Sequence, residues 1–344
     1  MKILVTGGAG FIGSNFVLRT LATRPDVEVV NVDLLTYAGN LENLKPVEGD
    51  PRHVFVKADV ADRDAMAALF ARHRFDGVLH FAAESHVDRS ILDATPFVVN
   101  NVLGTQVLLD LAREQEVPRY LQVSTDEVYG TLGPDDPAFT ETTPLAPNSP
   151  YAASKAAADL LVRAAFHTHG MDVVTTRCSN NYGPLQFPEK LIPLMIANAL
   201  EGKPLPVYGD GQQVRDWIHV EDHNDAVWAV FERGRAGEVY NIGAENEWAN
   251  IDVVKAILAA VGQGEDLIRY VQDRPGHDRR YAMDSTRMRD ELGWSARRTF
   301  EQGLPATVAW YVEHREWWQR VRSGAYREYY EAQYGTRTGS GSGA

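Results

Sequence analysis

Residues 3–13 read ILVTGGAGFIG, an apolar run that ends in a cluster of glycines. Gly8, Gly10 and Gly13 fit the spacing G-x-G-x-x-G, and Gly7, Gly10 and Gly13 fit the related G-x-x-G-x-x-G. Glycine at these positions permits a tight turn, lets the backbone approach a pyrophosphate and lets a helix pack closely on a strand. The stretch therefore predicts a strand, a phosphate-binding turn and a helix whose first N–H groups point at the phosphates.

Two acidic residues further along fit the same kind of site. Asp33 ends the second apolar run, where a carboxylate can accept hydrogen bonds from both ribose hydroxyls and would repel a 2′-phosphate. This favours NAD over NADP as the cofactor, against the alternative of a glycine-rich turn and a surface aspartate. Asp59 ends the third run and could contact the adenine side, or could equally cap the helix predicted over 65–72.

The first half of the chain alternates β-rich runs with helical stretches. The runs cover residues 3–5, 27–32, 54–56, 78–81, 120–123 and 173–176, and the clearest helical stretches cover 65–72 and 102–112. This alternation predicts an α/β fold with a Rossmann-type, doubly wound parallel sheet. After residue 182 proline, glycine and aromatic residues become common. We therefore predict a dinucleotide-binding domain over 1–182, a smaller, partly interleaved α/β substrate lobe over 183–334 with a helix over 310–320, and a flexible tail over 335–344.

Charge and composition limit the partners. The formal net charge of −13 disfavours nucleic acid and anionic membranes as partners. No apolar run approaches the ~20 residues needed to span a bilayer, and the first apolar run is interpreted as a strand rather than an export signal, so we expect a cytoplasmic protein. The single cysteine, Cys178, has no partners for a disulfide or a zinc site, so no metal is predicted.

A tyrosine and a lysine stand four residues apart. Tyr151 and Lys155 share one face of a helix that Ser149 can cap and Pro150 can begin. A nearby ammonium and a positive nicotinamide ring would favour the phenolate, which could then take a hydroxyl proton during oxidation. The alternative is an ordinary surface pair.

Residues 124–130 read STDEVYG and place two adjacent carboxylates where a parallel strand ends. A hydroxyl of Ser124 or Thr125 could bond the sugar oxygen that is oxidised. Oxidation at C4 of a hexose acidifies the C5 hydrogen, so one carboxyl group can remove that hydrogen while another protonates the departing C6 hydroxyl. Asp126 and Glu127 would face opposite sides of an ideal strand, so we predict that the chain has already turned there. Solvated loop carboxylates are the alternative.

Cations recur in the second lobe of this acidic chain. Lys190, Arg215 and the segment 273–280 lie beside prolines or aromatic residues, and arginine matches diphosphate oxygens well. We interpret them as a basic cup for an anionic substrate, with scattered surface charge as the alternative. His86 could border the sugar or be structural.

The chain resembles the extended short-chain dehydrogenase/reductase superfamily and, within it, the dTDP-glucose 4,6-dehydratase family. The resemblance extends to about residue 334, and its strings cover 6–13, 33–40, 81–90, 124–130, 149–155, 178–184, 187–193, 215–222 and 273–280. It implies C4 oxidation by NAD, loss of water across C5–C6 and hydride return to C6. It implies that Thr125, Tyr151 and Lys155 serve oxidation, that Asp126 is the acid and that Glu127 is the base.

The resemblance also implies binding residues and a homodimer formed through helices of the first lobe. For NAD these residues are Gly7, Gly10, Phe11, Ile12, Gly13, Asp33, Leu34, Leu35, Thr36, Asp59, Val60, Phe81, Ala82, Ala83, Val99, Tyr151, Lys155 and Asn181. For a dTDP-glucose substrate they are Ser85, Thr125, Asn180, Lys190, Leu191, Pro206, Val207, Tyr208, Arg215, Asn250, Asp273, Arg274, Pro275, Gly276, His277 and Tyr334. Val99 departs from a family threonine, and Trp248-Ala249 departs from a polar pair.

Three other functions fit parts of the pattern. A nucleotide-sugar C4 epimerase or a decarboxylase would share the glycine turn and the Tyr/Lys pair but does not need adjacent carboxylates. A non-catalytic NAD-binding protein would need neither set. The Asp126-Glu127 pair therefore favours the dehydratase.

Overall fold

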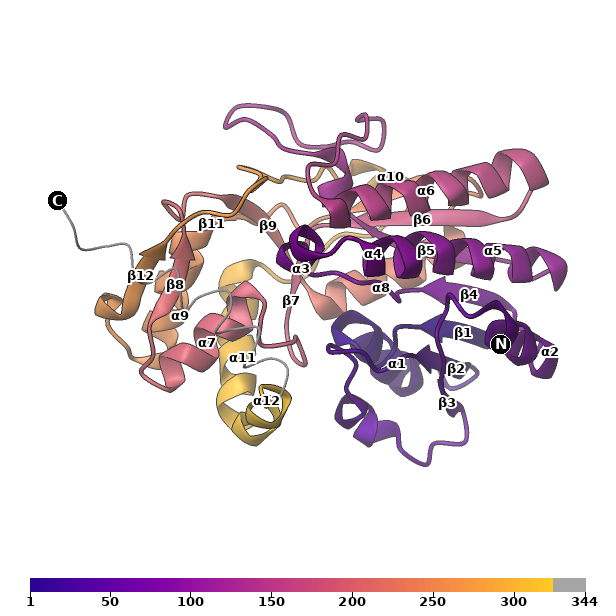
Figure 1. The fold of residues 1–344 in the computed structure, drawn as a ribbon, viewed down its shortest axis with the longest axis horizontal. Helices are drawn as coiled ribbons and strands as arrows, with labels where there is room; N and C mark the ends of the chain where they lie inside the picture. Colours follow the sequence, from indigo (N-terminus) through magenta and orange to yellow (C-terminus); the bar gives the residue numbers. More distant parts are fainter. Residues whose placement is uncertain (324–344) are drawn as a thin grey trace.

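The protein is described by a computed structural model, which describes residues 1–323. Its centre is a seven-stranded parallel sheet (Figure 1). The strands, in sheet order, are β10 (Val239–Ile242), β6 (Val173–Cys178), β5 (Tyr120–Thr125), β4 (Gly77–His80), β1 (Lys2–Thr6), β2 (Glu28–Asp33) and β3 (His53–Lys57). The predicted Rossmann-type fold is confirmed.

Helices cover both faces of this sheet, which explains why its central strands β4, β5 and β6 are buried throughout. One face packs against α1 (Phe11–Thr23), α8 (Val220–Arg233) and α10 (Thr286–Leu292). The other packs against α2 (Arg63–Arg72), α5 (Gly104–Glu114) and α6 (Pro150–His169). Short helical segments lie between them: η1 (Leu41–Val47), α3 (Val87–Leu92), α4 (Thr95–Phe97), η2 (Val98–Leu103) and η3 (Asp126–Tyr129).

The second lobe lies beyond the carboxyl ends of these strands (Figure 1). It holds a three-stranded sheet, in the order β11 (Glu247–Ala249), β9 (Val214–His219) and β7 (Asn180–Tyr182), and the pair β12 (Ile268–Val271) and β8 (Leu205–Tyr208). Its helical segments are α7 (Leu191–Leu200), α9 (Asn250–Val261), η4 (Glu265–Leu267), α11 (Phe300–Glu313) and α12 (Arg315–Val321). Because α8 and β10 return to the main sheet between β9 and β11, the two lobes are interleaved along the chain.

One predicted element is wrong. The helix expected over 310–320 is two helices, since α11 ends at Glu313 and α12 begins at Arg315. His314 between them leaves helical geometry, with its ring stacked on Trp310 at 4.3 Å between centroids. Among residues 1–323 no helix is long and apolar enough to cross a membrane.

Candidate active site

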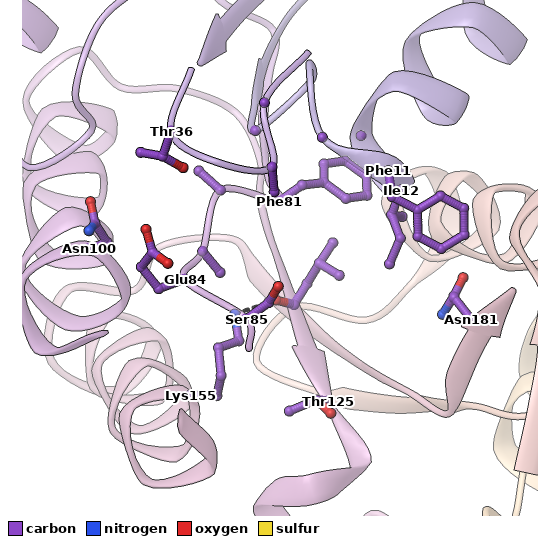
Figure 2. Close-up of a pocket in the computed structure, with 18 of the residues that line it drawn as sticks. Phe11, Ile12, Thr36, Phe81, Glu84, Ser85, Asn100, Thr125, Lys155 and Asn181 are labelled. Atoms are coloured by element: carbon purple, nitrogen blue, oxygen red, sulfur yellow. Dashed lines mark hydrogen bonds between the residues drawn. The ribbon is translucent and has the colours of Figure 1, made fainter. Parts of the chain in front are cut away.

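A cavity of about 290 Å³ opens where β1, β2, β4 and β5 end, between the two lobes. Figure 2 shows Asn100 and Lys155 on one side of it and Asn181 on the other. Ligands bind in open α/β sheets at this edge. The predicted site residues that line it are Gly7, Gly10, Phe11, Ile12, Gly13, Asp33, Leu34, Thr36, Asp59, Val60, Phe81, Ala82, Ala83, Ser85, Thr125, Asp126, Glu127, Tyr151, Lys155, Asn180, Asn181 and Lys190.

The glycine turn leaves room for a pyrophosphate. A Cβ on Gly13 would lie 2.2 Å from the carbonyl oxygen of Gly7, so only glycine lets α1 begin this close to β1. Helix α1 has Gly10 at its cap position and no side-chain capping bond, so its first N–H groups face the cavity without a side-chain partner. An anion is the natural partner of such a helix end.

Asp33 completes this end of the cavity. Its carboxylate is fixed by the N–H groups of Ala9 and Leu35, at 2.9 and 2.8 Å, and it lies on the cavity wall at the end of β2. Each carboxylate oxygen still has a lone pair to accept a ribose hydroxyl. The turn and Asp33 therefore fit the diphosphate and one ribose of a dinucleotide.

The structure places Asn100, rather than Val99, on the cavity wall. Residues 98–103 form a π-helix, η2, in which one extra residue per turn shifts the register of the side chains. The predicted Val99 therefore lies one residue before the side chain that lines the cavity. The neighbouring Asn101 holds the β4–α3 loop, since it accepts from the Glu84 N–H at 2.9 Å and donates to Ser154 at 2.8 Å.

The predicted oxidation residues meet at the middle of the cavity. Ser149 caps α6 as predicted, by accepting from the Ala152 N–H at 3.1 Å. One turn later the ammonium of Lys155 donates to the Val123 carbonyl at 2.8 Å, which ties α6 to β5. The Thr125 side chain lowers the pKa of the Tyr151 phenol, against the larger effect of burial.

Burial sets the direction of both pKa shifts in the Tyr151/Lys155 pair. The pKa of the Tyr151 phenol is raised well above its usual value, first by burial and then by the Glu127 carboxylate. Burial likewise lowers the pKa of the Lys155 ammonium, against the opposing charge of Asp159. The chain alone therefore keeps Tyr151 protonated, and a phenolate there requires a positive charge from the ligand.

The predicted turn at the carboxylate pair is present. β5 ends at Thr125, and Asp126 and Glu127 begin the 3₁₀ segment η3, so both side chains reach the same cavity. The Thr125 hydroxyl caps this segment by accepting from the Glu127 N–H at 3.3 Å and donates to one oxygen of Asp126 at 3.1 Å. The other oxygen of Asp126 is buried and has no hydrogen-bond partner within residues 1–323. It is free to donate or accept toward a ligand.

The two carboxyl groups differ in their surroundings. Burial raises the pKa of Asp126 well above its usual value, and the neighbouring Glu127 charge raises it further. Burial also raises the pKa of Glu127, but the cations Arg274, Lys190 and Arg215 oppose that shift. The environments therefore favour a protonated Asp126 beside an ionised Glu127.

These three cations come from the second lobe. Lys190 donates to the Ser85 carbonyl at 2.8 Å and lines the cavity. Arg215 is buried, lies 4.2 Å from the centre of the Tyr281 ring and donates to the Asp278 carbonyl. Arg274 bonds Asp88 at 3.3 Å, while its Nε atom is buried without a partner among the described residues. The local basic cup expected in this acidic protein therefore surrounds Glu127.

Some predicted residues lie off the cavity wall. They are Leu35, Val99, Leu191, Pro206, Val207, Tyr208, Arg215, Asn250, Asp273, Arg274, Pro275, Gly276 and His277, and Tyr334 lies outside the described residues. Most belong to the second lobe near the basic cup; for example, His277 contacts Asp273 at 2.6 Å, and its ring lies 6.1 Å from that of Tyr208.

Several cavity residues were missed. Glu84, Asn100, Gln186 and Phe187 line the wall without having been predicted. Glu84 adjoins the predicted Phe81–Ala83 and Ser85, so continuity of that loop was a usable signal. Asn100 lines the wall because of the π-helical register of η2, and Gln186 and Phe187 lie in the loop after β7. Neither feature gave a comparable signal in the sequence.

A doubly wound sheet with a glycine turn, an acidic residue ending β2 and a Tyr/Lys pair on α6 defines a dinucleotide-dependent enzyme of the short-chain dehydrogenase/reductase type. A family model described as GDP-mannose 4,6 dehydratase matches residues 4–307. The chain belongs to the dTDP-glucose 4,6-dehydratase family.

The relatives support that assignment along nearly the whole chain. The chain is 55% identical to a dTDP-glucose 4,6-dehydratase from Neisseria meningitidis, over 95% of this chain and 97% of the relative. It is 49% identical to the enzyme of that name from Bacillus anthracis in complex with NAD, with a TM-score of 0.88 and coverage of 93% and 99%. It is 50% identical to DesIV of Streptomyces venezuelae, a dTDP-glucose 4,6-dehydratase with NAD and TYD bound, with a TM-score of 0.90 and coverage of 93% and 100%.

Proposed function

We propose that this protein is an NAD-dependent hydro-lyase that converts dTDP-glucose to dTDP-4-keto-6-deoxyglucose. The observation that carries the proposal is the turn at η3, which brings Asp126 and Glu127 into one cavity with Thr125, Tyr151 and Lys155. An epimerase has no use for two carboxyl groups of opposite protonation at this point.

For the oxidation, Tyr151 takes the proton of the C4 hydroxyl, and the Thr125 hydroxyl turns from Asp126 to donate a hydrogen bond to the same sugar oxygen. NAD, when bound, accepts hydride from C4, supplies the positive charge that favours the Tyr151 phenolate and returns hydride to C6. Lys155 donates to the Val123 carbonyl and so fixes α6, which carries Tyr151, against β5, which carries Thr125. This fixed geometry favours the transfer of the C4 hydroxyl proton to Tyr151.

For the elimination, Glu127 removes the C5 proton, which the new C4 ketone has made acidic. Asp126 gives its proton to the C6 hydroxyl as the C6–O bond breaks, so that water leaves and a C5–C6 double bond forms. When hydride returns to C6, the protonated Glu127 gives a proton to C5, which restores its carboxylate. The differing environments of the two carboxyl groups support this division of roles.

The basic cup supports binding of a nucleoside diphosphate. Arg215 and Arg274 present forked donors and Lys190 a point charge close to Glu127. We propose that they hold the diphosphate and sugar, with residues 1–182 as the NAD-binding domain and 183–334 as the nucleotide-sugar lobe.

We further propose that the protein acts as a homodimer in the cytoplasm. Helix α6 contacts both α3 and η2, and each of these elements bears exposed apolar side chains: Leu92 is 69% exposed, Leu160 57%, Val98 55% and Leu103 49%. A patch of this kind on one face marks a protein interface. The single thiol, Cys178, is buried and reduced, which is compatible with a cytoplasmic location.

The proposal is tested by incubating the purified protein with dTDP-glucose in deuterated water, without added NADH, and following the sugar by proton NMR. A 4-keto-6-deoxy product with deuterium at C5 is expected, because Glu127 exchanges its proton with solvent. Appearance of the C4 epimer would instead assign an epimerase. Unchanged dTDP-glucose would refute the proposed substrate. If UDP-glucose and other nucleotide sugars also remained unchanged, the dehydratase function itself would be refuted.

A further inference from the structure

A buried arginine lies behind the catalytic edge of the sheet. Arg177 is the penultimate residue of β6, paired with Ser124 of β5 on one side and Asn241 of β10 on the other. Its neighbour Cys178 lines the cavity, so Arg177 points to the opposite face of the sheet. Only 6% of it is exposed, and neither ligand proposed above reaches it.

Two of its nitrogens bond to different elements. The Nε atom donates to Asp159 of α6 at 2.9 Å, and a terminal nitrogen donates to the Tyr129 hydroxyl of η3 at 3.0 Å. That hydroxyl donates in turn to Asn241 at 2.7 Å, and Asn241 donates to the Phe139 carbonyl at 2.9 Å. All these side chains are buried, so each bond acts in a medium of low dielectric.

The two elements joined by Arg177 carry different halves of the chemistry. Asp159 follows Lys155 by one helical turn on α6, which also bears Tyr151. Tyr129 is the last residue of η3, which begins with Asp126 and Glu127. We propose that the Asp159–Arg177–Tyr129 bridge positions the elimination carboxyl groups relative to the oxidation residues, so that Tyr129, Arg177 and Asp159 are positioning residues for the loss of water. The proposal rests on the dehydratase function proposed above.

The bridge holds η3 more firmly than it holds α6. Helix α6 is already tied to β5 through Lys155 and packs along its length against β5 and β6. The four-residue η3 is held by its cap at Thr125, by the bond from the Ala146 N–H to the Val128 carbonyl at 3.0 Å and by Tyr129, whose ring stacks on Phe139 at 4.9 Å. Loss of the bridge should therefore displace Asp126 and Glu127 while leaving Tyr151 and Lys155 in place. The oxidation should proceed and the elimination should slow.

The test uses Tyr129→Phe, which removes only the hydroxyl, and Arg177→Lys, which keeps a positive charge beside Asp159 but loses the fork that also reaches Tyr129. The control is Tyr120→Phe, another buried tyrosine whose hydroxyl makes a side-chain hydrogen bond, of 3.0 Å to Gln122, at the opposite end of β5. Each NAD-loaded variant is mixed with dTDP-glucose, and bound NADH and released 4-keto-6-deoxy sugar are followed through one turnover. The unfolding midpoint is measured in parallel.

We expect Tyr129→Phe and Arg177→Lys to form NADH at the wild-type rate but to consume it about ten-fold more slowly, since displacement of a catalytic group by a fraction of an ångström costs on that order. KM should change little, and Tyr120→Phe should behave as wild type. Equal loss of both steps, or wild-type consumption of NADH by either variant, would overturn the proposal. This holds also for a variant whose unfolding midpoint is lower than that of the wild type. If one variant fails to fold, the other decides. A wild-type protein inert toward dTDP-glucose would refute the proposed function itself, whereas an active wild type beside normal variants would refute only the bridge.

Discussion

At the scale of single residues, the proposed chemistry depends on keeping two adjacent carboxyl groups in opposite protonation states. Asp126 is buried beside a negative charge and bonds only Thr125, whereas Glu127 faces Arg274, Lys190 and Arg215. Neighbouring positions in the chain thus obtain different roles from different surroundings. The sequence shows the pair itself. The cations come from segments that lie up to 147 residues further along the chain (274 − 127), and only the fold brings them close to Glu127.

Replacing Glu127 with glutamine should stop the reaction after the oxidation, because the amide cannot take the C5 proton. We expect turnover to fall by at least about a hundred-fold, on the order of a general-base contribution, and NADH to build up on the enzyme. Absorbance of reduced nicotinamide and product NMR measure both effects. Tyr151→Phe is the matched comparison: it should lose the first step and form no NADH. Wild-type-like turnover by Glu127→Gln would remove Glu127 from the role of base.

The pH dependence of kcat should be bell-shaped. Glu127 works ionised, so activity is lost as pH falls through its pKa, which is raised above 4.5. Asp126 works protonated, so activity is lost as pH rises through its pKa, which is raised well above 3.8. The two groups interact, so the limbs report the pair.

Arg274→Gln should move the acid limb to higher pH, because the cation that most opposes the rise in the Glu127 pKa is then removed. The measurement is kcat against pH at saturating substrate. Arg279→Gln serves as control, since Arg279 lies in the same segment but pairs with Asp210 at the surface. An acid limb that stays in place in Arg274→Gln would show that Glu127 does not set it.

At the scale of elements, what could be predicted followed local patterns. The six predicted strands, the glycine turn, the cap at Ser149 and the turn after Thr125 are all present, because each depends on residues close together in the chain. The register of η2 could not be predicted, since an inserted π-helical residue leaves apolar periodicity nearly unchanged. The break at His314 was missed for a similar reason: Trp310, Trp317 and Trp318 continue an amphipathic pattern across it.

The turn that carries the carboxyl groups ends at Gly130, and this glycine should be essential. Its φ is +92°, and an added Cβ would lie 2.5 Å from the carbonyl oxygen of Ala146, a backbone atom that cannot move aside. Gly130→Ala should shift η3, lower turnover at least about ten-fold and cost about 1–3 kcal/mol of unfolding free energy.

Gly170→Ala is the control for this substitution, since Gly170 also has a positive φ, +67°, but nothing within 4 Å of an added Cβ. It should lower the unfolding midpoint slightly and leave turnover intact. NAD occupancy should be unchanged in both variants, because neither glycine lines the cavity. Normal turnover in Gly130→Ala would show that η3 tolerates displacement.

At the scale of the whole molecule, interleaving ties the two lobes together. The chain leaves the main sheet after β6, builds β7, α7, β8 and β9 of the second lobe, and returns through α8 and β10 before leaving again. The Rossmann part therefore contributes the glycine turn and both catalytic sets, while the second lobe contributes the cations around Glu127. Because several chain segments cross between the lobes, the basic cup is held against the carboxyl pair without depending on one hinge.

The last prediction concerns the proposed homodimer. Leu160 is 57% exposed on α6, and in a two-fold interface each substitution occurs twice. Burying one leucine contributes about 1.5–3 kcal/mol, so Leu160→Glu should weaken association by about a hundred-fold or more and convert the dimer to monomers at micromolar concentration. Sedimentation equilibrium gives the mass directly. Tyr270→Glu is the control, because Tyr270 is 61% exposed on β12 of the second lobe and should leave the dimer intact. A monomeric wild type would refute the homodimer, and a Leu160→Glu variant that stays dimeric would move the interface away from α6.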